Sequence, residues 1–266
     1  MERPEWLLTI TEADYHEARA KYVTSHGLID FCRCPLAYHL RETGVMKRKE
    51  SSGYALGSAT HALVLEGQSV FDDQYTVADG PINPKTDNPY GRETKKFAEW
   101  MATQDKAVVA TADYAMMSEI RDNVMRHPKA VELLSHGLPE GTIRATLEEV
   151  DMQMRLDWFS DRSGITDLKT CLDLDRFEYD ARDYDYVRQL SVYAAGVMVS
   201  SGEIPQVHLI AAEKKEPYRV GVWRIPDELI ETGIDSVRGS LRELKKSYAN
   251  NTWPTGYEEV RRLFDK

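Results

Sequence analysis

The segment from residue 152 to residue 170 constrains the fold more than any other part of the chain, because its pattern predicts a β-hairpin. Residues 152–159 have the composition of a β-strand, and the Ser-Asp-Arg-Ser-Gly run at 160–164 is typical of a turn. Residues 165–169 then predict a second strand. A hairpin at this point requires a sheet against which its apolar side chains can pack.

Three charged side chains of this hairpin form a candidate catalytic group. Asp167 and Lys169 are two residues apart on a strand, so both point to one face while Leu168 points into the core. The turn can fold Asp157 back towards that face. Carboxylates are hard oxygen ligands for Mg²⁺, and an ammonium beside them can steer water or offset charge on a scissile phosphate. The alternative is a solvated hairpin, and these three residues alone do not decide between the two.

Two further motifs flank the hairpin in the sequence. His61 lies in an apolar helical pattern at 57–65 that a glycine opens, and Gln189 and Tyr193 are spaced i and i+4 on one face of a predicted helix. Taken alone, a histidine on such a helix is more often structural than a ligand. The Gln/Tyr pair alone says almost nothing.

In combination, these motifs resemble the PD-(D/E)xK nuclease superfamily. The shared order is Gly-x-x-x-His, then Asp, then Asp-x-Lys-Thr, then Gln-x-x-x-Tyr, and it is most similar to the RecB-like and RecE-like exonuclease branch. One departure is Leu156, which stands where a proline often precedes the first aspartate. The segments that are also similar to that branch are 27–38, 57–67, 126–134 and 213–222.

The resemblance implies a role for each residue of the hairpin. Asp157 and Asp167 would bind the metal, the backbone carbonyl of Leu168 would add a ligand, and Lys169 would orient or activate the attacking water. His61 is similar to the histidine that contributes to a second metal position. Mg²⁺ is the expected ion, and Mn²⁺ should also support activity because imidazole suits it better.

Other polar groups have weaker assignments. Gln189 and Tyr193 resemble the pair that holds the site or the DNA backbone, with a helix packed behind the sheet as the alternative. Glu148 and Glu149 could supply another carboxylate, although an exposed turn is the simpler interpretation. The acidic run at 173–185 predicts a solvated loop that a DNA path would avoid.

Three basic clusters are candidates for DNA contact, each with a plain solvated face as its alternative. The first two are predicted to touch DNA, and the third lies at helical spacing near the C-terminus. Their residues are Lys47, Arg48 and Lys49 in one loop, Arg92, Lys95 and Lys96 at the start of a helix, and Arg238, Arg242, Lys245 and Lys246.

Length and composition limit the function classes. A chain of 266 residues suits a single domain spanning 1–266, and a net charge of −10 argues against a protein that coats nucleic acid nonspecifically. A locally basic channel could still attract DNA. The sequence shows no bilayer-spanning run and no signal-peptide pattern, which favours a cytoplasmic protein. The resemblance to RecE-like exonucleases implies a bacterial or phage origin. Its three cysteines do not provide the four ligands of an iron–sulfur cluster.

The predicted fold is α/β, with a central mixed β-sheet flanked by helices. Helices are expected at 12–22, 27–43 (interrupted at Pro35), 92–103, 111–126 and 184–200, with a C-terminal helix at 226–250 that could break near Gly233. Strands are expected at 141–147, 207–213 and 219–224, and a loop at 79–91. The resemblance implies a restriction-endonuclease-like core with an N-terminal helical extension.

For function, the resemblance implies a metal-dependent exonuclease that digests double-stranded DNA from its ends. It implies 5′→3′ polarity, a ring-like homo-oligomer, and a single-stranded product tail for an annealing protein of the RecT type. Two alternatives remain open from the sequence. One is a non-catalytic module that binds DNA ends, and the other is an endonuclease of the same superfamily.

Overall fold

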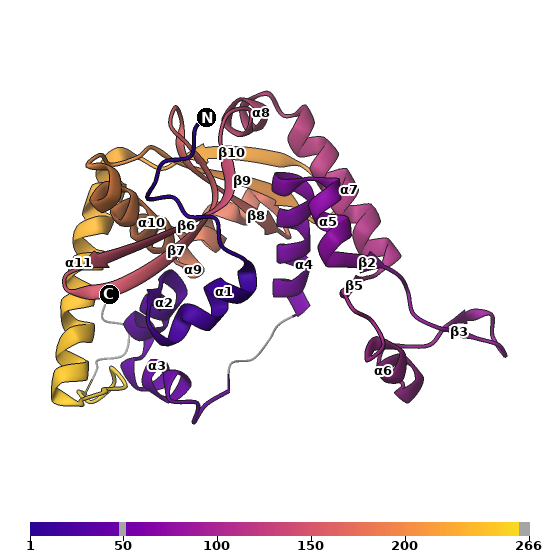
Figure 1. The fold of residues 1–266 in the computed structure, drawn as a ribbon, viewed down its shortest axis with the longest axis horizontal. Coiled ribbons are helices and arrows are strands. Elements are labelled where there is room, and N and C mark those ends of the chain that lie inside the picture. The colour runs from indigo at the N-terminus through magenta and orange to yellow at the C-terminus, as the bar shows by residue number, and fades with distance from the viewer. Residues whose placement is uncertain (48–51, 261–266) are drawn as a thin grey trace.

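The computed structural model describes residues 1–47 and 52–260 and contains a central six-stranded mixed sheet flanked by helices, as predicted (Figure 1). Strands β1, β7, β8, β9 and β10 follow one another across the sheet, and β6 pairs with β7. The strand bounds are β1 Val23–Thr24, β6 Leu138–Leu147, β7 Val150–Ser160, β8 Gly164–Cys171, β9 Val207–Glu213 and β10 Val220–Arg224.

The sheet is mixed because only some of its connections are hairpins. β6 and β7 are antiparallel and joined at Glu148 and Glu149, whose φ angles of 48° and 62° suit a tight two-residue turn. β7–β8 and β9–β10 are antiparallel, whereas β8 and β9 are parallel and connected through α9 (Phe177–Asp183) and α10 (Tyr186–Ser201). The predicted catalytic hairpin is therefore present as β7 and β8, and both strands are longer than predicted.

Helices α10 and α11 (Asp227–Asn250) cover one face of the sheet. Gly196 lets α10 pack closely on the sheet, because a Cβ at this position would lie 2.4 Å from Met154 Sδ on β7. The suggested break of the C-terminal helix near Gly233 is wrong, because α11 is continuous there. Gly233 instead lets α11 approach α10, since a Cβ at this position would lie 2.0 Å from Ser191 Oγ.

The opposite face is covered by helices from the first half of the chain. Leu168 and Ile210 of the sheet pack there against Val64, Ile120 and Val124. The helices on this side are α4 Ser52–His61, a π-helical turn η2 Ala62–Glu66, α5 Gln68–Gln74, α7 Thr111–Arg126 and α8 Pro128–Leu134. The inward direction predicted for Leu168 is thus confirmed.

The predicted N-terminal helical extension precedes this core. Thr11 is the N-cap of its first helix, since Thr11 Oγ1 accepts the Asp14 N–H at 3.0 Å. This helix ends five residues earlier than expected. The interruption at Pro35 is confirmed, since α2 ends at Arg33 and Pro35 starts α3. The elements are α1 Glu12–Glu17, η1 Ala18–Ala20, α2 Ser25–Arg33 and α3 Pro35–Glu42.

A separate arm extends from the body between α5 and α7 (Figure 1). The predicted loop at 79–91 contains a two-residue ladder, and the helix predicted at 92–103 is limited to α6 (Lys95–Met101). Phe97 and Trp100 pack together at the base of α6, with ring centroids 5.5 Å apart. The arm's strands are β2 Tyr75–Val77, β3 Ile82–Asn83, β4 Asn88–Pro89 and β5 Ala107–Val109.

The interpretation of the acidic run at 173–185 as a solvated loop is wrong. It forms a 3₁₀ turn, η3 (Leu174–Arg176), and then α9. Arg219 donates to Asp175 at 3.1 Å and to the fully buried Glu213 at 2.7 Å, so part of the negative charge is neutralised by ion pairs.

Among the described residues, no helix is both long and apolar enough to cross a membrane.

Candidate active site

The candidate site lies where β7 and β8 separate. The two strands pair at Ser160–Gly164, Phe159–Ile165 and Trp158–Thr166, and the next pair in this register would be Asp157 with Asp167. The ladder stops there, and Asp157 Oδ2 accepts the backbone N–H of Leu168 at 2.9 Å. A side chain thus replaces the sheet hydrogen bond, which brings the two aspartates together at an opening in the sheet.

Asp167 and Lys169 form a buried ion pair beside this opening. Lys169 Nζ lies 2.7 Å from Asp167 Oδ2, and the Asp167 side chain is fully buried. Burial and the nearby Asp157 raise the pKa of Asp167 to about 6, although Lys169 and His61 oppose the shift. For Lys169, burial alone would lower the pKa, but Asp167 and Asp157 outweigh it and the net pKa is raised. The ammonium is therefore charged at neutral pH.

His61 reaches the same opening from the other layer. It is the last residue of α4, directly before the π-helical turn, a distortion that is frequent at functional sites. His61 Nδ1 lies 3.5 Å from Asp157 Oδ2. The sequence motifs 96 residues apart are thus brought together as predicted.

Glu140 is a further site residue that the sequence analysis missed. It lies on β6 opposite Asp157 and has a left-handed φ of 53°, which is uncommon for a residue other than glycine. Its carboxylate is held by Arg155 Nε from the neighbouring strand. Residues with a strained backbone, such as the left-handed Glu140, are frequent at functional sites. A signal was available in the sequence, since the Pro139 and Gly141 that flank Glu140 indicate an irregular strand.

Three of these side chains can share a cation. His61, Glu140 and Asp157 each offer one ligand atom, and these atoms all lie within 4.8 Å of one another. Burial and the negative charge of Asp157 raise the pKa of Glu140 to about 7, against the lowering effect of Arg155. A mixed imidazole and carboxylate donor set with repelling acidic groups fits a divalent metal such as Mg²⁺ or Mn²⁺. Asp167 is outside this group because its carboxylate is turned to Lys169.

Gln189 and Tyr193 lie on α10, behind the sheet. Gln189 Nε2 donates to Tyr193 Oη at 2.8 Å, and the two residues are only 6% and 5% exposed. Burial, followed by Asp167 and Asp157, raises the pKa of the Tyr193 phenol well above its usual value. The pair is therefore buried, and Tyr193 lies close enough to both aspartates for their charge to affect it.

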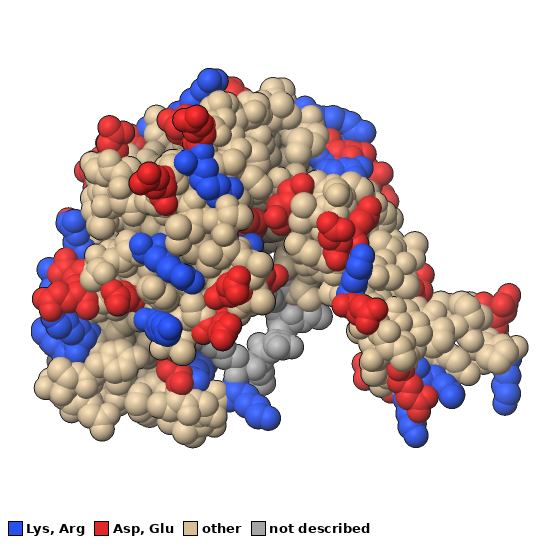
Figure 2. Space-filling view, in the orientation of Figure 1, with Lys and Arg blue, Asp and Glu red and all other residues tan. Residues whose placement is uncertain are grey.

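The predicted DNA-contact residues are not part of this cluster. Lys47 is exposed after α3, while Arg48 and Lys49 lie outside the described residues. On the arm, Lys95 and Lys96 each lie 3.6 Å from Glu99, and the Arg92 guanidinium lies over the Phe97 ring. Figure 2 shows a wide notch between the arm and the block formed by α1, α2 and α3, with basic side chains along the arm's lower edge.

The carboxylates of the β6–β7 turn are remote from the site. Glu149 pairs with Lys245, and Glu148 lies 3.4 Å from Arg242 and 3.9 Å from Arg238, all on α11. These contacts tie the turn to the helix. The alternative in which Glu148 or Glu149 supplies a metal ligand is therefore wrong. Arg238, Arg242 and Lys245 contact these two carboxylates, and Lys246 pairs with Glu243 at 2.7 Å.

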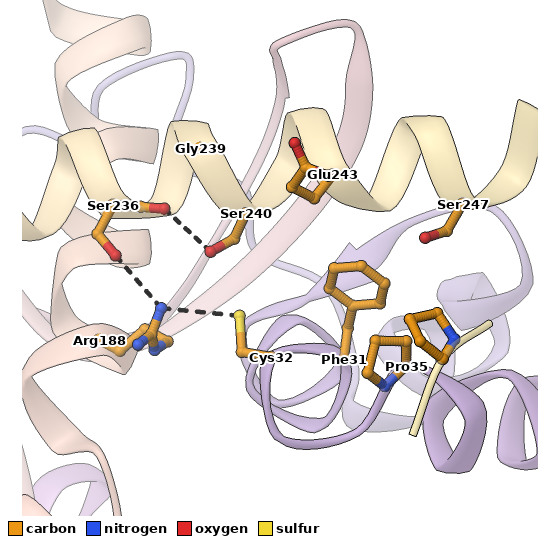
Figure 3. Close-up of a pocket in the computed structure, with 10 residues that line it drawn as sticks. Phe31, Cys32, Pro35, Arg188, Ser236, Gly239, Ser240, Glu243 and Ser247 are labelled. Carbon is orange, nitrogen blue, oxygen red and sulfur yellow. Dashed lines mark hydrogen bonds between the residues drawn. The ribbon is translucent and has the colours of Figure 1, made fainter. Parts of the chain in front are cut away.

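A cavity of about 500 Å³ lies between α2, α10 and α11 (Figure 3), and its described lining includes none of the candidate site residues. Arg188 spans its edge, with Nη1 at 3.7 Å from Cys32 Sγ and 3.4 Å from Ser236 Oγ. The site where β7 and β8 separate is a cluster of largely buried charged groups, whereas the described residues that line this cavity include no carboxylate pair and no histidine.

Comparisons with known proteins agree with this architecture. A "PDDEXK-like domain of unknown function (DUF3799)" matches residues 25–263, and no curated protein matches. The fold is similar to the crystal structure of a "Putative exonuclease" from Eubacterium rectale, with 14% identity, a TM-score of 0.69 and 97% of each chain covered. The restriction-endonuclease-like core implied by the motifs is thus confirmed. The chain belongs to this family of PDDEXK-like domains.

Proposed function

We propose that the protein is a metal-dependent deoxyribonuclease that hydrolyses phosphodiester bonds at the ends of double-stranded DNA. The observation that carries this proposal is the convergence of His61, Glu140 and Asp157 beside the Asp167–Lys169 pair at the fork of β7 and β8. Membership of a PDDEXK-like family supports the same chemistry.

His61, Glu140 and Asp157 would hold the cation, with Asp167 and the Leu168 carbonyl as further candidate ligands from β8. A bound Mg²⁺ or Mn²⁺ would supply Lewis-acid activation and charge neutralisation at a phosphate. Arg155 fixes the Glu140 carboxylate, and the Leu168 N–H fixes that of Asp157. The chain therefore preorganises these two carboxylates without needing the ion for their orientation.

Lys169 is the residue that acts on the reacting groups. Its ammonium is charged, and its side chain is 16% exposed at the edge of the opening. At this place it can orient a water molecule by hydrogen bonding and stabilise negative charge that develops on the scissile phosphate. The buried Asp167 holds the ammonium in place, so that Lys169 is not free to swing into solvent.

The finer assignment remains that of a RecE-like exonuclease. We propose 5′→3′ digestion that leaves a single-stranded tail for an annealing protein of the RecT type, by a ring-like homo-oligomer in the cytoplasm of a bacterium or of a phage-infected cell. A ring would gather exposed basic residues such as Lys47, Arg92, Lys95 and Lys96 around the DNA. This arrangement would reconcile a net charge of −10 with binding to a polyanion.

The test is digestion of linear duplex DNA that carries a label on either its 5′ or its 3′ end, with Mg²⁺ or Mn²⁺. The wild type should release labelled nucleotide, and Asp167→Asn and Lys169→Met should not. Lys129→Met is the matched control, because Lys129 is exposed on α8 and pairs with the exposed Glu132 at 2.6 Å. Equal activity in all variants would refute the site. Nicking of closed circular DNA would indicate an endonuclease, and end binding without turnover would indicate a non-catalytic module.

A further inference from the structure

A row of aromatic rings leads from the catalytic lysine to the surface. Lys169 Nζ lies 5.1 Å from the centroid of the Tyr186 ring, and Tyr186 stacks on Tyr184 with centroids 5.7 Å apart and planes inclined by 22°. Tyr184 is 60% exposed. The outer end of the row is thus an exposed ring that is separated from Lys169 by the Tyr186 ring.

The inner end of the row is rigid. Tyr186 contacts Phe177 with centroids 6.2 Å apart, and Phe177, which is buried, contacts Trp223 at 4.7 Å. Trp223 Nε1 donates to Glu178 at 3.3 Å. Because these rings come from α9, α10 and β10, the position of Tyr186 is set by three packed elements.

The backbone between the two tyrosines is also fixed. Tyr184 N–H donates to Asp180 O at 2.8 Å and ends α9, and Asp185 has a left-handed φ of 61°. The Asp185 carboxylate accepts from Arg188 Nε at 2.7 Å. The uncommon backbone conformation of Asp185 is held by its ion pair with Arg188, and it places both rings on the same side of the turn between α9 and α10. The pairing of the rings is therefore a built feature and not a chance orientation of a surface side chain.

The charges around the row favour a neutral ligand. Asp180 and Asp183 lie on α9 before Tyr184, and Asp180 is close enough to act electrostatically on Tyr186. Carboxylates repel phosphate, whereas an exposed tyrosine face attracts the flat, uncharged surface of a base. The positive charge for the phosphate comes from Lys169 at the other end of the row.

We propose that Tyr184, held on Tyr186, is a stacking subsite for the nucleobase of the nucleotide next to the scissile phosphate. This inference rests on the proposed nuclease function and specifies how the strand end is positioned. Stacking is sequence-tolerant, because each base has a π face. The subsite would therefore fix the reacting nucleotide without making the enzyme sequence-specific.

Fluorescence of 2-aminopurine at the 5′-terminal nucleotide of a duplex tests the subsite, because stacking on an aromatic ring quenches it. Full-length Asp167→Asn protein with Mg²⁺ is the background, so that the DNA is bound but not cut. Quenching should persist with Tyr184→Phe and disappear with Tyr184→Leu. Tyr179→Leu is the matched control, because Tyr179 is 59% exposed on α9 but Arg176 and Arg182 lie over its ring.

Cleavage by the otherwise unaltered enzyme provides the second readout. Tyr184→Leu should lower kcat/KM about ten-fold on normal DNA, which is the size expected for one stacked base. The loss should vanish on a duplex with an abasic analogue at the terminal nucleotide. Quenching that does not depend on Tyr184, or an equal loss on abasic DNA, would overturn the subsite.

The two proposals fail in different ways. If the wild type cleaves DNA and Tyr184→Leu matches it in both assays, the nuclease stands and the stacking subsite is refuted. If the wild type cuts no DNA while quenching still requires the Tyr184 ring, the nuclease is refuted and a nucleotide-binding surface stands. If the wild type neither binds nor cuts duplex ends, both are refuted.

Discussion

Glu140 and Asp157 lie opposite each other across β6 and β7, and the two carboxylates reach the same cluster as His61. Glu140 has a left-handed backbone, and the Asp157 carboxylate accepts the Leu168 N–H where the β7–β8 ladder stops. Local departures from regular strand geometry in two neighbouring strands thus assemble the candidate metal ligands.

Glu140→Gln should weaken metal binding. An amide is a poorer ligand than a carboxylate, so we expect the dissociation constant for Mn²⁺ in calorimetry to rise about ten-fold or more. Glu148→Gln, at the other end of the same hairpin, is the matched control and should bind Mn²⁺ like the wild type. An unchanged constant for Glu140→Gln would exclude this residue from the metal site.

Asp157→Asn should blunt stabilisation by metal without harming the apo fold. The asparagine keeps an oxygen for the Leu168 N–H but removes repulsion with Asp167 and Glu140, so the apo melting temperature should stay level or rise. For the wild type, Mn²⁺ at 100 times its dissociation constant should add about 2.7 kcal/mol of stability. Calorimetric scans with and without Mn²⁺ measure both effects, with Asp151→Asn on the same strand as control. A full metal shift in Asp157→Asn would place the ion elsewhere.

The apo protein should become more stable as the pH falls from about 8 to about 5. The pKa of Glu140 is raised to about 7 and that of Asp167 to about 6, chiefly by burial, so the folded state binds more protons than the unfolded state in this window. Glu213 has the opposite sign: hydrogen bonding to Arg219 lowers its pKa to about 2, and its contribution is lost only below about pH 4.5.

Thermal melts of the apo protein across this range measure the effect, and Glu140→Gln should flatten the rise. Metal affinity should change in the reverse direction, because protonated carboxyl groups do not bind cations. A wild-type melting temperature that falls from pH 8 to pH 6, or that responds to pH just as Glu140→Gln does, would show that these carboxyl groups do not control stability.

Lys169→Met should abolish cleavage while metal is still bound. Loss of the ammonium removes a group that acts on the reacting atoms, and we expect the rate to fall by about a hundred-fold or more. Asp167 then lacks its buried partner, which should raise its pKa further and leave it protonated at neutral pH. Single-turnover digestion measures the loss of rate, and Mn²⁺ calorimetry measures whether the metal is still bound. A normal rate would show that Lys169 is only structural.

Two glycines of one helix should respond to alanine in opposite directions. Gly233→Ala places a methyl group against Ser191 and should cost about 1–3 kcal/mol. Gly239→Ala has open space and should gain up to about 1 kcal/mol from helix propensity. Urea denaturation measures both changes. Equal effects at the two positions would contradict the close contact between α10 and α11.

The sequence was most informative where function depends on local spacing. The positions of Asp167 and Lys169 on one strand follow from a two-residue period, and the motif order links them to His61. Glu140 was missed because its role depends on pairing between β6 and β7 and on one unusual backbone angle. The unbroken α11 and the folded acidic run were missed for the same reason, since Ser191 and Arg219 supply contacts that are distant in sequence.

The fork between β7 and β8 also bears on how mutants of this protein should be interpreted in a cell. The amide of Leu168 relies on the Asp157 side chain where a sheet partner would otherwise stand. An alanine at Asp157 would leave that amide without its acceptor, at a cost of about 1–3 kcal/mol, and could lower protein abundance as well as chemistry. An asparagine preserves the acceptor. Only the asparagine allele therefore separates loss of catalysis from loss of the protein in a genetic experiment.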